Sequence, residues 1–75
     1  MARLPIDDVP LATEPMRLGQ FLKLAGLAEH GAHAKELLEA GEVQVNGRAA
    51  SRRGAQLRSG DVVAVHGRRA RAVVR

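Results

Sequence analysis

The chain has 75 residues, no cysteine and an apolar fraction of 45%, which fits one small globular domain and excludes disulfides and thiolate metal sites. Its net charge is +4: residues 1–42 carry four basic and seven acidic side chains, whereas residues 43–75 carry eight arginines and one aspartate. No apolar run approaches the roughly 20 residues of a membrane span, and a half this basic favours a polyanionic partner, with nucleic acid as the first candidate.

Prolines punctuate the start of the chain. Pro5, Pro10 and Pro15 each disfavour a helical conformation in the residue before them. We therefore expect residues 1–14 to form an extended or loosely attached tail and residues 15–75 to form the domain. The tail carries two aspartates and lacks the apolar core of a secretory signal, which predicts a cytoplasmic protein.

Two helical patterns follow the tail. Apolar residues recur at the spacing of one helix face over residues 18–25, and a second such pattern runs over residues 32–40. A glycine follows each pattern and is a typical helix stop. Lys35 and Glu39 form an i, i+4 pair on the second helix, worth a few tenths of a kcal/mol at best. The short connection predicts that the two helices pack as a tight pair.

The pattern changes to alternation after the second helix. Residues 43–45 alternate valine with a polar residue, and Asn46 and Gly47 follow as the turn of a hairpin. Two further strands are predicted over residues 62–65 and 69–74. The predicted fold class is α+β, with two N-terminal helices packed on a small, twisted, mostly antiparallel sheet.

Five stretches of the sequence keep the spacing of one known domain. They are RLGQFLKLAGL (residues 17–27), GAHAKELL (31–38), GEVQVNG (41–47), RRGAQL (52–57) and GDVV (60–63). Together they resemble the S4 RNA-binding domain, also called the αL motif, over residues 17–66. The chain looks most similar to the small bacterial proteins that consist of one stand-alone S4 domain. The resemblance implies a positive surface, formed by the helix pair and the adjacent loop, that holds structured RNA, often ribosomal RNA or tRNA.

Two positions depart from the family pattern. Many S4 domains begin the second helix with Ser-Arg, where this chain has His30 and Gly31, so one basic side chain is lost. Gly19 stands where an aspartate often caps the first helix, which weakens the signal for the start of that helix.

Aromatic residues are nearly absent, since Phe21 is the only Phe, Tyr or Trp. The chain therefore lacks the stacking platform on which proteins usually hold single-stranded bases. We expect it to contact the backbone and shape of a folded or double-stranded RNA, with weak sequence discrimination.

Eight side chains are the candidate RNA contacts. Arg52 and Arg53 are adjacent on a predicted loop, where two guanidinium groups can fork onto phosphate oxygens. A salt bridge with Asp61 is the alternative for Arg58, and an ordinary solvated surface is the alternative for the others. The eight are Arg17, Lys23, His30, Lys35, Arg48, Arg52, Arg53 and Arg58.

The C-terminal arginines have two open interpretations. They can extend the RNA surface, or they can keep an edge strand from pairing with another chain. These residues are Arg68, Arg69, Arg71 and Arg75.

The sequence lacks the parts of an enzyme. It has no cysteine nucleophile, no plausible Ser-His-Asp arrangement and no phosphate-binding glycine loop. His30 and His33 stand three residues apart, but His66 is the only further histidine, and a zinc site needs three or four ligands. We expect no catalysis, no cofactor, no metal, no membrane association and no small-molecule substrate. The first expected partner is structured RNA, with ribosomal RNA as the first candidate, and an association with the ribosome would follow from it.

Two other functions stay open at this point. Acidic side chains gather around the predicted helices and would repel RNA on one face, which favours a protein-interaction adaptor whose positive charge is incidental. Duplex DNA binding is the third possibility, although the second helix offers few base-reading side chains. The acidic residues are Glu29, Glu36, Glu39 and Glu42.

Overall fold

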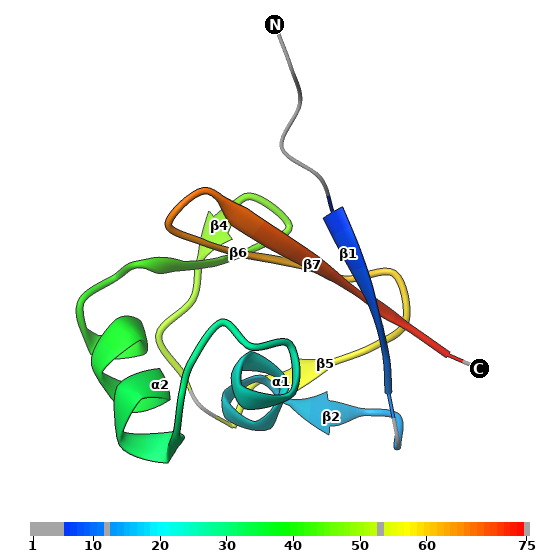
Figure 1. The fold of residues 1–75 in the computed structure, drawn as a ribbon, viewed down its shortest axis with the longest axis horizontal. Helices are drawn as coiled ribbons and strands as arrows, with labels where there is room; N and C mark the ends of the chain where they lie inside the picture. The colour runs from blue at the N-terminus through cyan, green and yellow to red at the C-terminus, as the bar shows by residue number, and fades with distance from the viewer. Residues whose placement is uncertain (1–5, 12, 53, 75) are drawn as a thin grey trace, which may run out of the picture.

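Both helices of the structure follow the periodicity of the sequence (Figure 1). The computed structural model describes residues 6–11, 13–52 and 54–74. Helix α1 spans Leu18–Leu24 and helix α2 spans Gly31–Glu39, so both predicted helices are confirmed. Two residues after each helix, a glycine adopts a positive φ, which terminates the helix.

The main sheet has five strands. They are β1 (Ile6–Pro10), β3 (Val43–Val45), β4 (Arg48–Ala49), β6 (Val62–Val65) and β7 (Arg68–Val73). Their order is β1-β7-β6-β3-β4, with β1 parallel to β7 and every other neighbour antiparallel. Asn46-Gly47 and His66-Gly67 both have positive φ at two successive residues, as the type I′ turn of a hairpin requires. The predicted α+β class and mostly antiparallel sheet are confirmed.

The first strand differs from the sequence expectation. Residues 1–14 are predicted to be a loose tail, but β1 pairs along its length with β7, and the Leu11 N–H donates to the Val73 carbonyl at 2.8 Å. The prediction of a loosely attached tail is therefore wrong for residues 6–11, whereas the alternative of an extended segment agrees with strand β1. Because β1 is an edge strand, a proline at its end is tolerated, and its exposed aspartates hide the alternation that marks a strand.

A second, very small sheet joins the start of α1 to a distant loop. Strand β2 (Met16–Arg17) pairs antiparallel with β5 (Gln56–Leu57). The Leu18 N–H extends this contact by donating to the Ala55 carbonyl at 2.7 Å. Strands of two residues give no periodic signal, so the sequence does not predict this sheet, although Leu57 is buried in the core.

The core lies between the helices and one face of the main sheet, and Figure 1 shows both helices on that face. We call the opposite face, which carries Asp8, Gln44, Ala64 and Arg71 by strand register, the outer face. Within the described ranges, neither helix is long and apolar enough to cross a membrane. The largest fully buried side chains are Phe21, Leu18, Leu22, Leu38, Leu57, Val43 and Val63.

Candidate nucleic-acid interface

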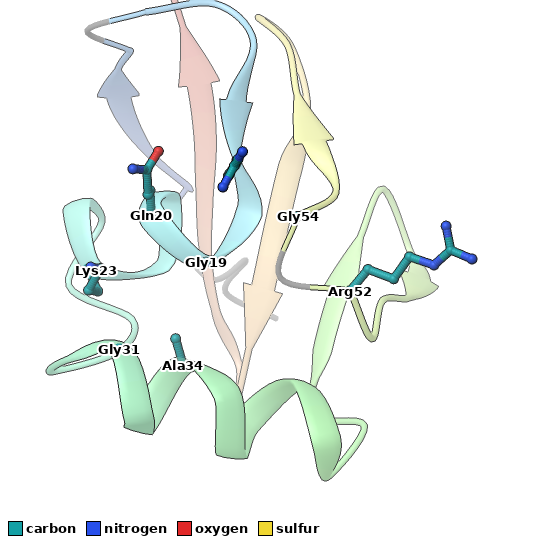
Figure 2. A pocket seen from close by; sticks show the side chains of 8 residues that line it. Gly19, Gln20, Lys23, Gly31, Ala34, Arg52 and Gly54 are labelled. Carbon is teal, nitrogen blue, oxygen red and sulfur yellow. The ribbon is translucent and has the colours of Figure 1, made fainter.

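An open groove of about 620 Å³ lies between α1, the start of α2 and the loop before β5 (Figure 2). Three cations from separate segments line it: Arg17 precedes α1, Lys23 lies in the last turn of α1, and Arg52 lies in the loop. We call this groove, with its eight lining residues, the basic groove. The other lining residues are small or uncharged: Gly19, Gln20, Gly31, Ala34 and Gly54.

The small sheet positions two of the three cations. Arg17 pairs with Gln56 in that sheet and is the extended residue that precedes α1. On the other strand, the Ala55 N–H donates to the Arg52 carbonyl at 3.2 Å in the turn that leads into β5. The backbone bond from Leu18 to Ala55 joins the two segments, so the small sheet holds Arg17 and Arg52 on one surface.

The third cation lies on the exposed face of α1. Phe21 and Leu22 point into the core, which turns Lys23 outward. Gln20 precedes Lys23 by three residues and shares its face. Figure 2 shows both side chains on α1, Ala34 projecting toward them from α2, and the Arg52 side chain extending outward from the loop. The charges therefore lie at the margins of the groove and the small residues form its floor.

The carboxylates expected to repel RNA lie outside the groove, since none of its eight lining residues is acidic. Several acids contact a basic side chain elsewhere on the surface. The pairs are Asp8–Arg71 at 2.8 Å, Lys35–Glu39 at 3.8 Å, and Glu42 with the His66 ring at 3.0 Å. No carboxylate in the lining of the groove therefore neutralises the charge of its three cations.

Two predicted contacts near α2 have roles within the fold. The His30 Nδ1 accepts the backbone N–H of His33 at 3.1 Å and so caps α2. Lys35 forms the predicted i, i+4 ion pair with Glu39. Neither side chain lines the basic groove, although His30 is adjacent to Gly31, which does.

The remaining predicted contacts lie apart from the groove or outside the described residues. Arg48 belongs to β4 at one edge of the main sheet. The Asp61 carboxylate accepts a hydrogen bond from the backbone N–H of Arg58 at 2.9 Å. This contact involves the main chain of Arg58, whereas the salt bridge given as the alternative would involve its guanidinium group. Arg53 lies outside the described residues.

Two C-terminal arginines bind within the fold. Arg68 donates a guanidinium hydrogen bond to the Gly26 carbonyl at 3.1 Å, where α1 has ended. Arg71 donates an Nε hydrogen bond to Asp8 Oδ1 at 2.9 Å, and its Nη2 forms an ion pair with the same oxygen at 2.8 Å. These contacts give both side chains structural roles in holding strand β7.

The histidine pair serves the start of α2. His33 Nδ1 accepts the Glu29 N–H at 3.0 Å, and His30 Nδ1 accepts the His33 N–H, so both rings bind backbone. Among the residues that the structure describes, no group of three metal-ligating side chains comes together.

Sequence reasoning missed the neutral part of the groove. Gln20 could have been found from its i, i+3 spacing to Lys23. Gly31 and Gly54 carry no sequence signal of their own, because a glycine is first taken as a turn or a helix boundary. Their common position appears only when the small sheet brings the loop to the helices.

Comparisons with known proteins point to one family. Residues 9–73 match the model of the S4 domain. The chain is 46% identical over 61 residues to the "Probable ribosome maturation protein RlbA" of Bacillus subtilis, covering 81% of this chain and 86% of that protein. It is 37% identical over 66 residues to the tyrosine–tRNA ligase of Burkholderia lata, covering 84% of this chain but only 16% of the ligase. Among solved structures, Escherichia coli YbcJ, described as having an αL motif involved in RNA binding, matches with a TM-score of 0.71 and 28% identity, covering 99% of this chain and 95% of YbcJ.

Proposed function

Because the chain belongs to the S4 domain family, we propose that it is a non-catalytic module that holds structured RNA in the basic groove. Arg17, Lys23 and Arg52 contact phosphates at the centre of this interface. His30, Lys35, Arg48, Arg53 and Arg58 are proposed as weaker, peripheral contributors.

One observation carries the proposal: three cations from separate segments line a groove whose lining contains no carboxylate. Guanidinium and ammonium groups bind phosphate oxygens by charge-assisted hydrogen bonds, and the guanidinium can do so with two bonds at once. Each contact releases counterions from the RNA. Three contacts would give a log–log salt slope of about −2 to −3, at 0.7–0.9 per contact.

Ribosomal RNA is the first proposed partner. The support is the Bacillus subtilis relative, whose name assigns it to ribosome maturation and which this chain matches over most of its length. Transfer RNA is the second candidate, because an S4-like part of a tRNA ligase is also similar. Action on ribosomal RNA would place the protein in the cytoplasm, in contact with ribosomes or their precursors.

The test is a fluorescence anisotropy titration of a structured RNA hairpin at several salt concentrations. A variant with Arg17→Gln, Lys23→Gln and Arg52→Gln removes three charges from the groove. At about 1 kcal/mol for each lost contact, its affinity should fall about 100-fold or more. The same sequence as a DNA hairpin should bind the wild type more weakly, since DNA lacks the 2′-hydroxyl and the A-form shape.

A second triple variant provides a matched control. Lys35→Gln, Arg48→Gln and Arg58→Gln remove the same amount of charge from exposed residues outside the groove. This variant should lose less than about tenfold in affinity, through the change in net charge and the loss of weak peripheral contacts. Equal losses in the two triple variants, or equal binding of RNA and DNA, would refute the groove as the RNA site. A protein partner retained by both variants would then favour the adaptor function.

A further inference from the structure

Two glycines of the basic groove have no explanation within the fold. Gly26 and Gly41 adopt positive φ and thereby end the helices, as only glycine does readily. Gly31 and Gly54 do not have positive φ, and a Cβ placed on either would meet no atom of the described residues within 4 Å. Backbone geometry and internal packing would therefore accept a side chain at both positions. A glycine without such a cause is typical where another molecule approaches the backbone closely.

Both unexplained glycines line the same groove, and the groove is larger than a phosphate contact requires. Its volume of about 620 Å³ lies within the range of pockets that enclose small organic molecules, about 300–1,000 Å³. Phosphate oxygens could be bound on a flat basic surface without any such space. The groove therefore provides room for a group other than the RNA backbone.

The charges and the floor of the groove suit different parts of a nucleotide. Arg52 extends outward from the loop, whereas Ala34 and the glycines leave a shallow, uncharged floor (Figure 2). Gln20 adds a neutral amide, which can donate to and accept from the edge of a base. This arrangement places phosphate-binding groups around a space that is neutral and lined partly by backbone.

Building on the proposed RNA function, we propose that the basic groove receives a single unpaired nucleotide extruded from an RNA helix. The base enters over Gly31 and Gly54, the Gln20 amide hydrogen-bonds to its edge, and the surrounding cations hold the flanking phosphates. The preferred RNA is then a helix with a bulge or an unpaired loop nucleotide rather than a continuous duplex.

The lack of aromatic residues is consistent with this binding mode. Phe21 is fully buried and the chain has no Trp or Tyr, so no Phe, Tyr or Trp ring is available to stack a run of bases. Arginine guanidinium planes also stack on unpaired bases, and Arg17 and Arg52 lie at the groove. Stacking on one plane suits one extruded base and not an extended single strand.

The experiment compares two RNA hairpins that differ by one unpaired nucleotide in the stem. The wild type should bind the bulged hairpin about tenfold more tightly than the fully paired one, a difference of about 1.4 kcal/mol. Gly31→Leu fills the groove without changing charge, and should reduce this preference to less than about twofold, because the affinity for the bulged hairpin falls more than the affinity for the paired one. Ala32→Leu adds the same side chain at the next position, which is exposed and does not line the groove, and should keep the preference.

The outcomes separate this inference from the function on which it rests. Equal affinity of the wild type for bulged and paired hairpins, with salt-dependent binding of both, would overturn the nucleotide site and leave the RNA function intact. The same conclusion would follow if Gly31→Leu weakened both hairpins equally while circular dichroism showed a folded variant. Failure to bind either hairpin more tightly than the matched DNA would overturn the RNA function itself.

Discussion

The basic groove and the outer face of the main sheet both carry arginine, but the surroundings of that arginine differ. In the groove, Arg17 and Arg52 share a lining that contains no acid. On the outer face, Arg71 forms a hydrogen bond and an ion pair with Asp8. The difference teaches that the number of arginines in a sequence does not locate a nucleic-acid site. What locates such a site is the distance between the arginines and the nearest carboxylates, and the fold sets this distance.

The largest effect is expected from a core substitution, because unfolding would abolish the basic groove and the outer face together. Phe21 on α1 is fully buried in the core, so Phe21→Ala should cost about 3–5 kcal/mol of unfolding free energy. A domain of this size has only about 4–11 kcal/mol in total, and RNA binding should fall with the folded fraction. Circular dichroism melts and anisotropy would measure the two effects. Leu24→Ala, on the same helix but half exposed, is the control and should change stability by less than about 0.5 kcal/mol.

A charge removal in each region tests the comparison directly. Arg52→Gln should weaken RNA binding about fivefold to tenfold and reduce the salt slope by about 1, as for the loss of one phosphate contact. Arg71→Gln removes the same charge from the outer face and should leave the slope unchanged. Affinities measured at four or more salt concentrations would give both slopes. If the two variants behaved alike, the groove and the outer face would be equivalent for RNA.

The ion pair of the outer face can be removed by a substitution that changes no residue of the groove. Asp8 and Arg71 have side chains that are 53% and 47% exposed, so Asp8→Asn should lower the unfolding free energy by only about 0.2–1 kcal/mol. Salt screens such a pair, so the difference between variant and wild type should shrink in high salt. Urea denaturation at low and high salt would measure it. A difference that persisted in high salt would show that Asp8 acts through its hydrogen bond to Arg71 and not through charge.

The smallest effect concerns the unexplained glycine of the groove. Gly31→Ala restricts the unfolded chain and raises helix propensity, so it should stabilise the protein by about 0.4–1 kcal/mol. Thermal melts at matched concentration would show the increase. A loss of stability would mean that Gly31 has a structural role in the fold, and the groove would then lose one of its two unexplained glycines.

Sequence periodicity predicted the elements that bury a regular face. Residues 18–25 and 32–40 show helical spacing and end at glycine, and the structure confirms both helices. Strand β1 escaped prediction because its exposed aspartates and edge position leave little alternation. The pairing of β2 with β5 escaped because two-residue strands are stabilised by distant partners rather than by local pattern.

The candidate site was predictable as a set of cations but not as a surface. Local spacing identified the Lys35–Glu39 pair, because its two residues are one helical turn apart. The sequence distinguishes Arg52 from Arg58 only by the adjacent Arg53, whereas in the structure Arg52 lines the groove and Arg58 does not. That distinction depends on the small sheet, which brings a loop from the second half of the chain to the start of α1.

The pairing of β1 with β7 also has a consequence for the order of events during synthesis. β1 is made early, but its hydrogen-bonding partner is made more than fifty residues later. Until β7 leaves the ribosome, β1 remains without its ladder and β6 lacks one of its two neighbours. Pairing across so long a stretch of sequence slows folding, because loop entropy is lost before the contact forms. The sheet is therefore completed only after translation of its last strand, while the helix pair, whose contacts are local, can assemble earlier.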